Sequence, residues 1–98
     1  MKFSFNENRE MVIEVSGTLS ITLGAGEADY TYRSHINGMQ ASEPDNWVAC
    51  KATGSDDKDY TAWYYVEDTN VDLGDIEYEE PDDIEDENGN IIYDKDAE

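Results

Sequence analysis

The chain has 98 residues, of which 25 are Asp or Glu and only 6 are Lys or Arg, so its formal net charge is −19. This charge argues against direct binding to nucleic acid or to an anionic membrane, because proteins contact both with Lys and Arg. The length allows one domain with a single modest core. Basic proteins, basic clefts and metal cations are the partners that the charge favours.

The negative charge is concentrated in the last third of the chain. Residues 1–66 hold ten acids and five bases, a net charge of −5, whereas residues 67–98 hold fifteen acids and one base, a net charge of −14. We therefore expect a β-sheet scaffold over 1–66 and an acidic segment over 67–98 that packs on the same domain.

Cysteine usage and hydropathy indicate where the protein works. Cys50 is the only cysteine, which excludes an internal disulfide and fits a reducing compartment. No apolar run approaches the length of a membrane-spanning helix, and the residues after Met1 are polar apart from Phe3 and Phe5, unlike a secretory signal. We expect a cytoplasmic protein.

The first elements follow a period of two. Phe3 and Phe5 predict a short strand. From Met11 to Leu23 apolar and polar side chains alternate, which predicts one strand, or two strands in register, with one face in water. Gly17 has no side chain to pack and predicts a bend or bulge.

The middle of the chain continues this pattern. Residues 24–26, Gly-Ala-Gly, predict a turn, and residues 28–35 predict a strand with Tyr30 and Tyr32 on one face. Residues 36–45 then form a connection that contains an Asn-Gly pair and a proline.

Residues 46–53 allow two interpretations. A strand here would pair with the strong strand pattern of residues 60–66 through a hairpin loop at 54–58. The alternative is a short helix near 43–52, because residues 42–45, Ser-Glu-Pro-Asp, resemble a helix cap. The strand is the preferred interpretation.

The chain ends in a second hairpin signal. Asn88-Gly89 separates two short apolar patterns and predicts a hairpin over 84–93, with positive φ at both turn residues. The elements together predict a mainly β protein, a single small domain with an antiparallel sheet and a C-terminal acidic segment that ends in a β-hairpin.

The sequence gives little support for catalytic activity. His35 is the only histidine and Cys50 the only thiol, and Ser34 next to His35 would point to the opposite face of a strand. We expect an exposed histidine, a buried cysteine, no catalytic residues and no enzyme activity.

A calcium loop around Gly89 also fails. With Gly89 as the sixth residue of an EF-hand loop, Ile84 occupies the first ligand position and Lys95 the twelfth, where a Glu is required. We expect no metal site and no cofactor.

The acidic run is the strongest functional signal. It holds 12 acids among residues 67–87, threaded with Val, Leu, Ile and Tyr, which a disordered tail would lack. Its simplest alternative is a solvated tail. On a strand, alternate carboxylates would repeat at roughly 6.7 Å on one face, a charge density comparable with that of nucleic acid. The expected partner-binding residues are Asp72, Asp75, Glu77, Glu79, Glu80, Asp82, Asp83, Glu85, Asp86 and Glu87, with Tyr78 as an aromatic anchor.

In size, charge and this interleaved run, the chain resembles the DNA-mimic proteins of phages and mobile elements, which include anti-restriction and anti-CRISPR proteins. The resemblance implies an inhibitor in the host-cell cytoplasm that occupies the basic cleft of a nucleic-acid-binding enzyme or complex. Two alternatives stay open, an immunity protein or chaperone that neutralises a basic protein, and a structural or accessory phage protein.

Overall fold

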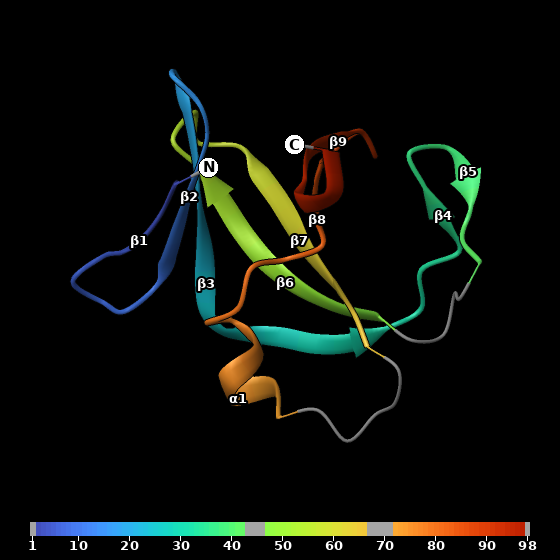
Figure 1. Ribbon diagram of the computed structural model, residues 1–98, viewed down its shortest axis with the longest axis horizontal. Coiled ribbons are helices and arrows are strands. Elements are labelled where there is room, and N and C mark those ends of the chain that lie inside the picture. Colours follow the sequence, from blue (N-terminus) through green and yellow to red (C-terminus); the bar gives the residue numbers. More distant parts are fainter. Residues whose placement is uncertain (1, 43–46, 67–71, 98) are drawn as a thin grey trace.

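The computed structural model describes residues 2–42, 47–66 and 72–97 (Figure 1). The elements within these ranges are, in chain order, β1 (Lys2–Phe5), β2 (Met11–Ser16), β3 (Leu19–Thr31), β4 (His35–Ile36), β5 (Met39–Gln40), β6 (Trp47–Gly54), β7 (Asp59–Tyr65), α1 (Leu73–Ile76), β8 (Asp83–Asp86), β9 (Ile91–Asp94) and the 3-10 turn η1 (Lys95–Ala97).

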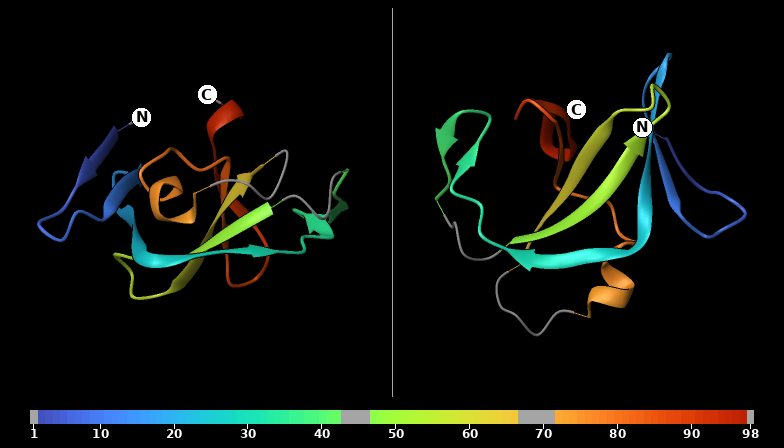
Figure 2. Two further views of the ribbon diagram at one scale, coloured as in Figure 1. Left: turned by 90° about the horizontal axis from the view of Figure 1, so that it is seen from below. Right: turned by 180° about the vertical axis from the view of Figure 1, so that it is seen from behind.

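Seven of these strands form one antiparallel sheet in the order β1-β2-β3-β6-β7-β8-β9, while β4 and β5 form a separate two-stranded sheet. The large sheet is therefore an up-and-down meander, and it curls strongly (Figure 2). Two of its connections carry other elements, the β4–β5 hairpin between β3 and β6 and the helical turn α1 between β7 and β8. The expectation of a mainly β, single-domain protein with an antiparallel sheet is confirmed. The acidic segment extends this sheet, because β8 pairs with β7.

The hydrophobic core lies on one face of the sheet. Alternation along β6 turns Val48 and Cys50 to this face, where they lie opposite Tyr64 and Ala62 of β7. Ile84 of β8 lies opposite Ala62 in turn, and its side chain is fully buried. Burial of each such aliphatic side chain stabilises the fold by about 1.5–3 kcal/mol, so the C-terminal hairpin is held by the same core as the scaffold.

The alternating pattern from Met11 to Leu23 forms two strands, β2 and β3, which pair antiparallel. Gly17 lies in the turn between them, and the register shifts between Glu14 and Ser16, just before that turn. The period of two continues through the hairpin, because Ile13 and Ile21 are register partners on the core face and both are fully buried.

The turn expected at residues 24–26 is wrong, because β3 continues through this stretch as a sharply bent strand (Figure 1). Leu23 pairs with Ala52 and Ala28 with Cys50, so β3 carries three more residues than β6 between these pairs. The extra residues form a bulge. Gly24 fits there because an added Cβ would lie 2.8 Å from the side chain of Glu27 and 3.1 Å from a backbone oxygen.

Residues 47–54 form β6, between β3 and β7, so the strand interpretation of 46–53 is confirmed and the helix alternative is wrong. Three of the four residues expected to cap that helix, 43–45, lie outside the described residues. The helix of the described chain is α1, at a position where the sequence predicted none. Tertiary pairing on both sides of β6 decides the outcome.

The two Asn-Gly pairs behave differently. Asn37 and Gly38 have φ of 52° and 84° and connect β4 to β5 directly, as a two-residue hairpin turn requires. At the predicted hairpin only Gly89 has positive φ, 85°, and the connection from β8 to β9 has four residues. The hairpin over 84–93 is confirmed, but its predicted two-residue turn is wrong. There the side chain of Asp86 accepts hydrogen bonds from backbone N–H groups of the turn.

Candidate functional site: an acidic surface and a buried arginine cluster

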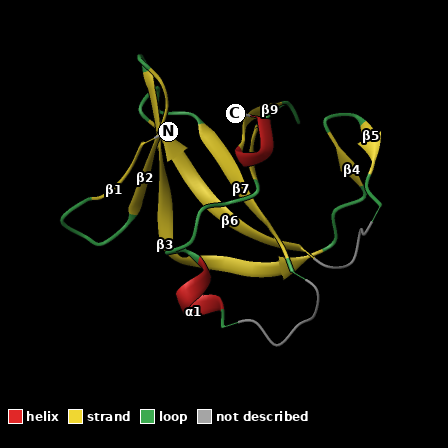
Figure 3. Cartoon of the chain, in the orientation of Figure 1, coloured by secondary structure: helices red, strands yellow, loops and turns green. Residues whose placement is uncertain are grey.

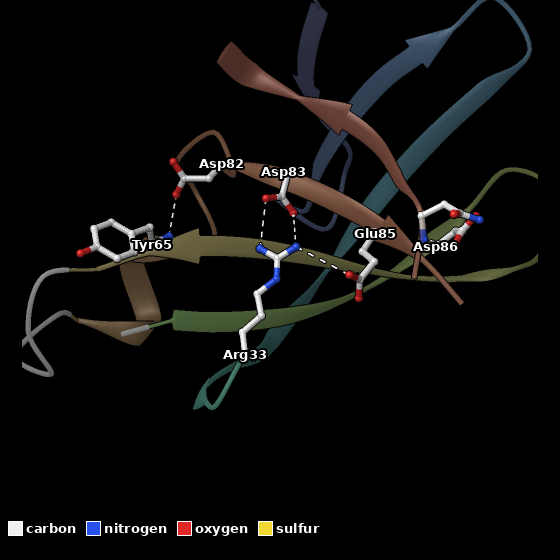
Figure 4. A network of polar contacts seen from close by, with 7 residues as sticks. Arg33, Tyr65, Asp82, Asp83, Glu85 and Asp86 are labelled. Atoms are coloured by element: carbon white, nitrogen blue, oxygen red, sulfur yellow. Dashed lines mark hydrogen bonds and ion pairs between the residues drawn. The ribbon is translucent and has the colours of Figure 1, made fainter. Parts of the chain in front are cut away.

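The acidic segment does not form one long strand (Figure 3). It contains the helical turn α1, an irregular stretch and the four-residue strand β8. Within residues 72–87, carboxylates two apart on one strand face, the arrangement expected to imitate a nucleic-acid backbone, occur only at Asp83 and Glu85. Both lie beside Arg33 (Figure 4). The exposed acids therefore form an irregular surface instead of a regular row. The first two acids of the run, at 67–68, lie outside the described residues.

Two of the ten expected partner-binding carboxylates are buried. Glu77 is 9% exposed, and its Oε2 accepts a hydrogen bond of 2.9 Å from the backbone N–H of Gly26, in the bulge of β3. Asp83 is 7% exposed and pairs with Arg33. Both carboxylates stabilise the fold, because each satisfies a polar group of another element.

Asp82 and Glu80 are partly exposed and have partners within the protein. Asp82 Oδ2 accepts from the backbone N–H of Tyr65 at 2.6 Å, and its Oδ1 lies 2.8 Å from Lys95 Nζ. The hydroxyl of Tyr93 donates to the Glu80 carboxylate. These contacts connect the stretch before β8 to the end of the chain.

The loop between β6 and β7 lies beside the turn between β8 and β9, because Tyr60 pairs with Asp86. The hydroxyl of Tyr60 donates to Asp56 Oδ2 at 2.6 Å. This bond is the main reason that the pKa of Tyr60 rises to about 12 and that the pKa of Asp56 is lowered. The pKa of Asp86 is lowered first by the backbone N–H of Asn90. The acids of this loop thus lie next to the acidic segment.

Eight of the ten expected carboxylates keep side chains that are exposed or partly exposed. We call these eight the acidic surface: Asp72, Asp75, Glu79, Glu80, Asp82, Glu85, Asp86 and Glu87. Lys95 is the only base among residues 67–98. Tyr78, the expected anchor, is 46% exposed and lies against Phe5, with ring centroids 6.0 Å apart.

A buried ion pair lies on the sheet face opposite the core. Arg33 is 3% exposed, and its two terminal nitrogens donate to the two carboxylate oxygens of Asp83 at 3.1 and 2.9 Å (Figure 4). Glu85 Oε2 lies 3.7 Å from the same guanidinium. Burial raises the pKa of Asp83, and the hydrogen bond from Arg33 opposes that rise.

Two tryptophans enclose the same guanidinium. Its central carbon lies 4.7 Å from the ring centroid of Trp47 and 4.3 Å from that of Trp63. Among the described residues, Arg33 Nε and both indole nitrogens are buried without a hydrogen-bond partner. The contacts with the rings are therefore cation–π and packing contacts. Arg33, Trp47, Trp63 and Asp83 form what we call the Arg33 cluster.

Strand register explains how the Arg33 cluster assembles. Trp63 lies opposite Asp83 of β8 on the outer face, and Trp47 lies opposite Thr31 at the end of β3. The strand expected over 28–35 ends at Thr31. Arg33 follows two residues later and lies over the two tryptophans. Sequence reasoning missed the cluster, although Trp47 and Trp63 occupy outward positions of neighbouring strands and thus signal a covered outer face.

The single histidine and the single thiol lie apart. Cys50 is fully buried in the core, and burial raises the pKa of its thiol to about 11. His35 is exposed, and its Nδ1 lies 3.0 Å from Ser34 Oγ. The assumption that neighbouring side chains diverge fails here because Ser34 lies outside the strand. Among the described residues no carboxylate forms a hydrogen bond or an ion pair with His35, whereas a nucleophile–base pair uses such a third group to orient its base.

No group of three or more His, Cys, Asp or Glu side chains that could hold a metal ion occurs within residues 2–42, 47–66 and 72–97. None of the helices in this part of the chain is long and apolar enough to cross a membrane. No family model, curated protein or solved structure matches the chain. Its function is therefore inferred from charge and geometry.

Proposed function

We propose that the protein is an inhibitor that binds the basic nucleic-acid-binding cleft of a host enzyme or complex in the cytoplasm, in the manner of anti-CRISPR or anti-restriction DNA mimics. The observation that supports this proposal is the acidic surface, eight exposed or partly exposed carboxylates on an ordered domain, in a segment that holds one base. Inhibition by occupancy requires no catalytic group and no cofactor in the inhibitor.

Electrostatic attraction determines both the association rate and the competition with nucleic acid in this mechanism. A net charge of −19 steers the protein toward an Arg- and Lys-lined cleft and accelerates association at low salt. Binding there releases the anions held by the cleft and excludes DNA or RNA from the same surface. Because exposed charges are screened beyond about 8 Å at physiological ionic strength, affinity and association rate should both fall steeply as salt is added.

Affinity capture from host lysate at low and high salt, followed by competition with DNA, tests the proposal. A nucleic-acid enzyme should be recovered at low salt, and excess DNA should displace the inhibitor from it. If an enzyme is recovered that DNA does not displace, the DNA-mimic function is wrong.

Matched charge reversals locate the contact. Glu79→Lys combined with Glu87→Lys changes two exposed members of the acidic surface and should weaken binding at least tenfold. Glu14→Lys combined with Asp29→Lys makes the same change in net charge at exposed positions of β2 and β3 and should weaken it much less. Equal losses in both variants would mean that only total charge matters.

A second candidate is a protein that neutralises one dedicated basic partner, as an immunity protein or chaperone does. The irregular spacing of the acids and the exposed Phe5–Tyr78 ring pair favour it. A single partner of defined shape can recognise such irregular features, whereas imitation of a uniform nucleic-acid backbone does not need them. It predicts a single stoichiometric partner that excess DNA does not displace.

A further inference from the structure

Phe5 and Tyr78 form an exposed aromatic pair that joins the first strand to the acidic segment. Their rings lie 6.0 Å apart at an interplanar angle of 46°, and they are 52% and 46% exposed. Phe3, on the same face of β1, is 40% exposed. Three large rings that keep this much of their surface in water form an apolar patch of the kind that marks contact sites.

The position of β1 explains why these rings are open to solvent. Phe5 lies opposite Met11, so its side chain is on the core face of the sheet, yet β1 is an edge strand (Figure 1). Met11 is buried, with 4% of its surface exposed, because its strand has neighbours on both sides. Tyr78 follows α1 and covers only part of the Phe5 ring. The core face is thus incompletely covered at this edge.

Carboxylates flank both rings along the chain. Glu7 follows Phe5 by two residues, and Glu79 is the immediate neighbour of Tyr78. Asp75 lies one turn earlier, and its carbonyl accepts from the backbone N–H of Tyr78 at 3.0 Å. All three acidic side chains are exposed. Arg9 is the one base in the turn that holds Glu7, so acids outnumber bases close to the rings in the sequence. An apolar patch with exposed carboxylates near it in the sequence suits a side chain that has a flat, weakly hydrated face and a positive charge.

Arginine is the side chain that has both properties. Its guanidinium stacks on aromatic faces and pairs with carboxylates, whereas the compact lysine ammonium is strongly hydrated and stacks less well. The Arg33 cluster shows this chemistry inside the same molecule, where two aromatic faces and a carboxylate hold one guanidinium. Phe5 and Tyr78, with the acids beside them, offer aromatic faces and carboxylates at the surface.

We propose that Phe5 and Tyr78 bind arginine side chains of the basic partner. This inference rests on the proposed function and specifies its chemistry, since it requires an arginine-bearing protein surface at this edge of the sheet. A second copy of this chain is disfavoured as the occupant, because two molecules that each carry −19 repel one another.

Ten-residue arginine and lysine peptides serve as probes in a fluorescence titration at about 50 mM salt, where surface charges are only partly screened. The wild-type protein should bind the arginine peptide about three- to tenfold more tightly than the lysine peptide, the ratio expected of one or two exposed cation–π contacts. Phe5→Leu with Tyr78→Leu should remove most of this preference and leave the affinity for the lysine peptide unchanged. Tyr78→Leu alone should remove part of it, and its small surface change keeps the test valid if the double variant unfolds.

Tyr32→Leu is the matched control. Tyr32 is 63% exposed, and residues 30–42 contain no acid, whereas Glu79 is the immediate neighbour of Tyr78 in the sequence. This variant should keep the full preference for arginine. The arginine site is wrong if the preference for the arginine peptide survives in both Tyr78 variants, or if the Tyr32 control loses it equally. In either case, binding of the peptides would still support the acidic surface. If neither peptide binds the wild-type protein, the arginine site and the proposed function are both wrong.

Discussion

Asp83 and Glu79 stand four residues apart in the same acidic run, yet the fold gives them opposite surroundings. Asp83 is buried against Arg33 and two tryptophans, whereas the side chain of Glu79 is exposed and only its carbonyl accepts a hydrogen bond, from the hydroxyl of Tyr64. A buried charge that loses its partner is costly, while an exposed charge interacts weakly with its neighbours. Acidic residues of one run thus have different roles, one in stability and one at the surface, and composition alone cannot distinguish them.

The same contrast separates two regions of the molecule. In the Arg33 cluster the positive charge comes from the chain itself, so the carboxylate stabilises the fold. On the acidic surface the carboxylates outnumber the bases near them, which are Lys95 beside Asp82, Arg33 beside Glu85 and Lys58 near Asp86. The repulsion among these carboxylates destabilises the fold, while their charge attracts cations. The Arg33 cluster is buried, whereas the acidic surface is exposed to solvent.

Replacement of a charge should have its largest effect inside the cluster. Asp83→Asn leaves the buried guanidinium of Arg33 with Glu85, at 3.7 Å, in place of its bidentate carboxylate partner, and should lower the free energy of unfolding by about 3 kcal/mol. Glu79→Gln, at an exposed position of the same run, should change it by less than about 0.5 kcal/mol. Urea denaturation of both variants measures the difference. Similar losses would show that the two regions do not differ as the structure indicates.

Glu77 provides an intermediate case, because it is buried but accepts from a neutral backbone group. Glu77→Ala removes the acceptor of the Gly26 N–H in the bulge of β3 and should lower the free energy of unfolding by about 1–3 kcal/mol. Glu87→Ala, at an exposed turn position, is the control and should have little effect. Hydrogen exchange at the Gly26 amide should accelerate in the first variant only, and unchanged exchange would contradict the role assigned to Glu77.

Strands and hairpins could be predicted from this sequence because their signals are local. The alternation of residues 11–23 reports which side chains face the core, and this holds whether the stretch is one strand or a hairpin. Gly24 and Gly26 predict a turn because glycine indicates a break in regular pairing but not which kind of break it is. A bulge and a turn differ only in what the flanking residues pair with, and that is decided by β6.

The acidic segment could be predicted only in part for the same reason. That it is ordered followed from the apolar residues within it, and the structure supports this for residues 72–97. Which acids are buried depends on Arg33 and Gly26, about fifty residues earlier. No periodicity within the segment reports such partners, so Glu77 and Asp83 looked like their exposed neighbours.

Salt should have a smaller and distributed effect. Raising ionic strength from about 0.02 M to 0.5 M shortens the screening length from roughly 20 Å to 4 Å, which weakens repulsion among exposed acids and should stabilise the wild-type protein by about 1 kcal/mol. In Glu79→Lys/Glu87→Lys the gain should be smaller. Thermal denaturation at both salt concentrations measures it. Salt-induced destabilisation would mean that attractive pairs, such as that of Asp82 with Lys95, outweigh the repulsion.

The smallest effect expected is the pH dependence that comes from the Tyr60–Asp56 hydrogen bond, beside the acidic surface. The pKa of Tyr60 is about 12 in the folded protein and 10 in its ordinary state, so the unfolded chain loses this proton first as the pH rises. The stabilisation is therefore complete below pH 10 and is lost between pH 10 and about 12. Asp56 has the opposite sign, because its pKa is lowered, and its contribution is lost on acidification.

Tyr60→Phe should remove the part of the alkaline loss that comes from Tyr60. Tyr64 and Cys50 also have raised pKa values because they are buried, so the variant should keep a weaker dependence of the same sign. The free energy of unfolding of wild type and variant, measured from pH 9 upward, should converge as Tyr60 ionises in the unfolded wild-type chain. If the two curves stay parallel through this range, the hydrogen bond from Tyr60 to Asp56 does not contribute to the pH dependence of stability, and Asp56 behaves as an exposed acid without this partner.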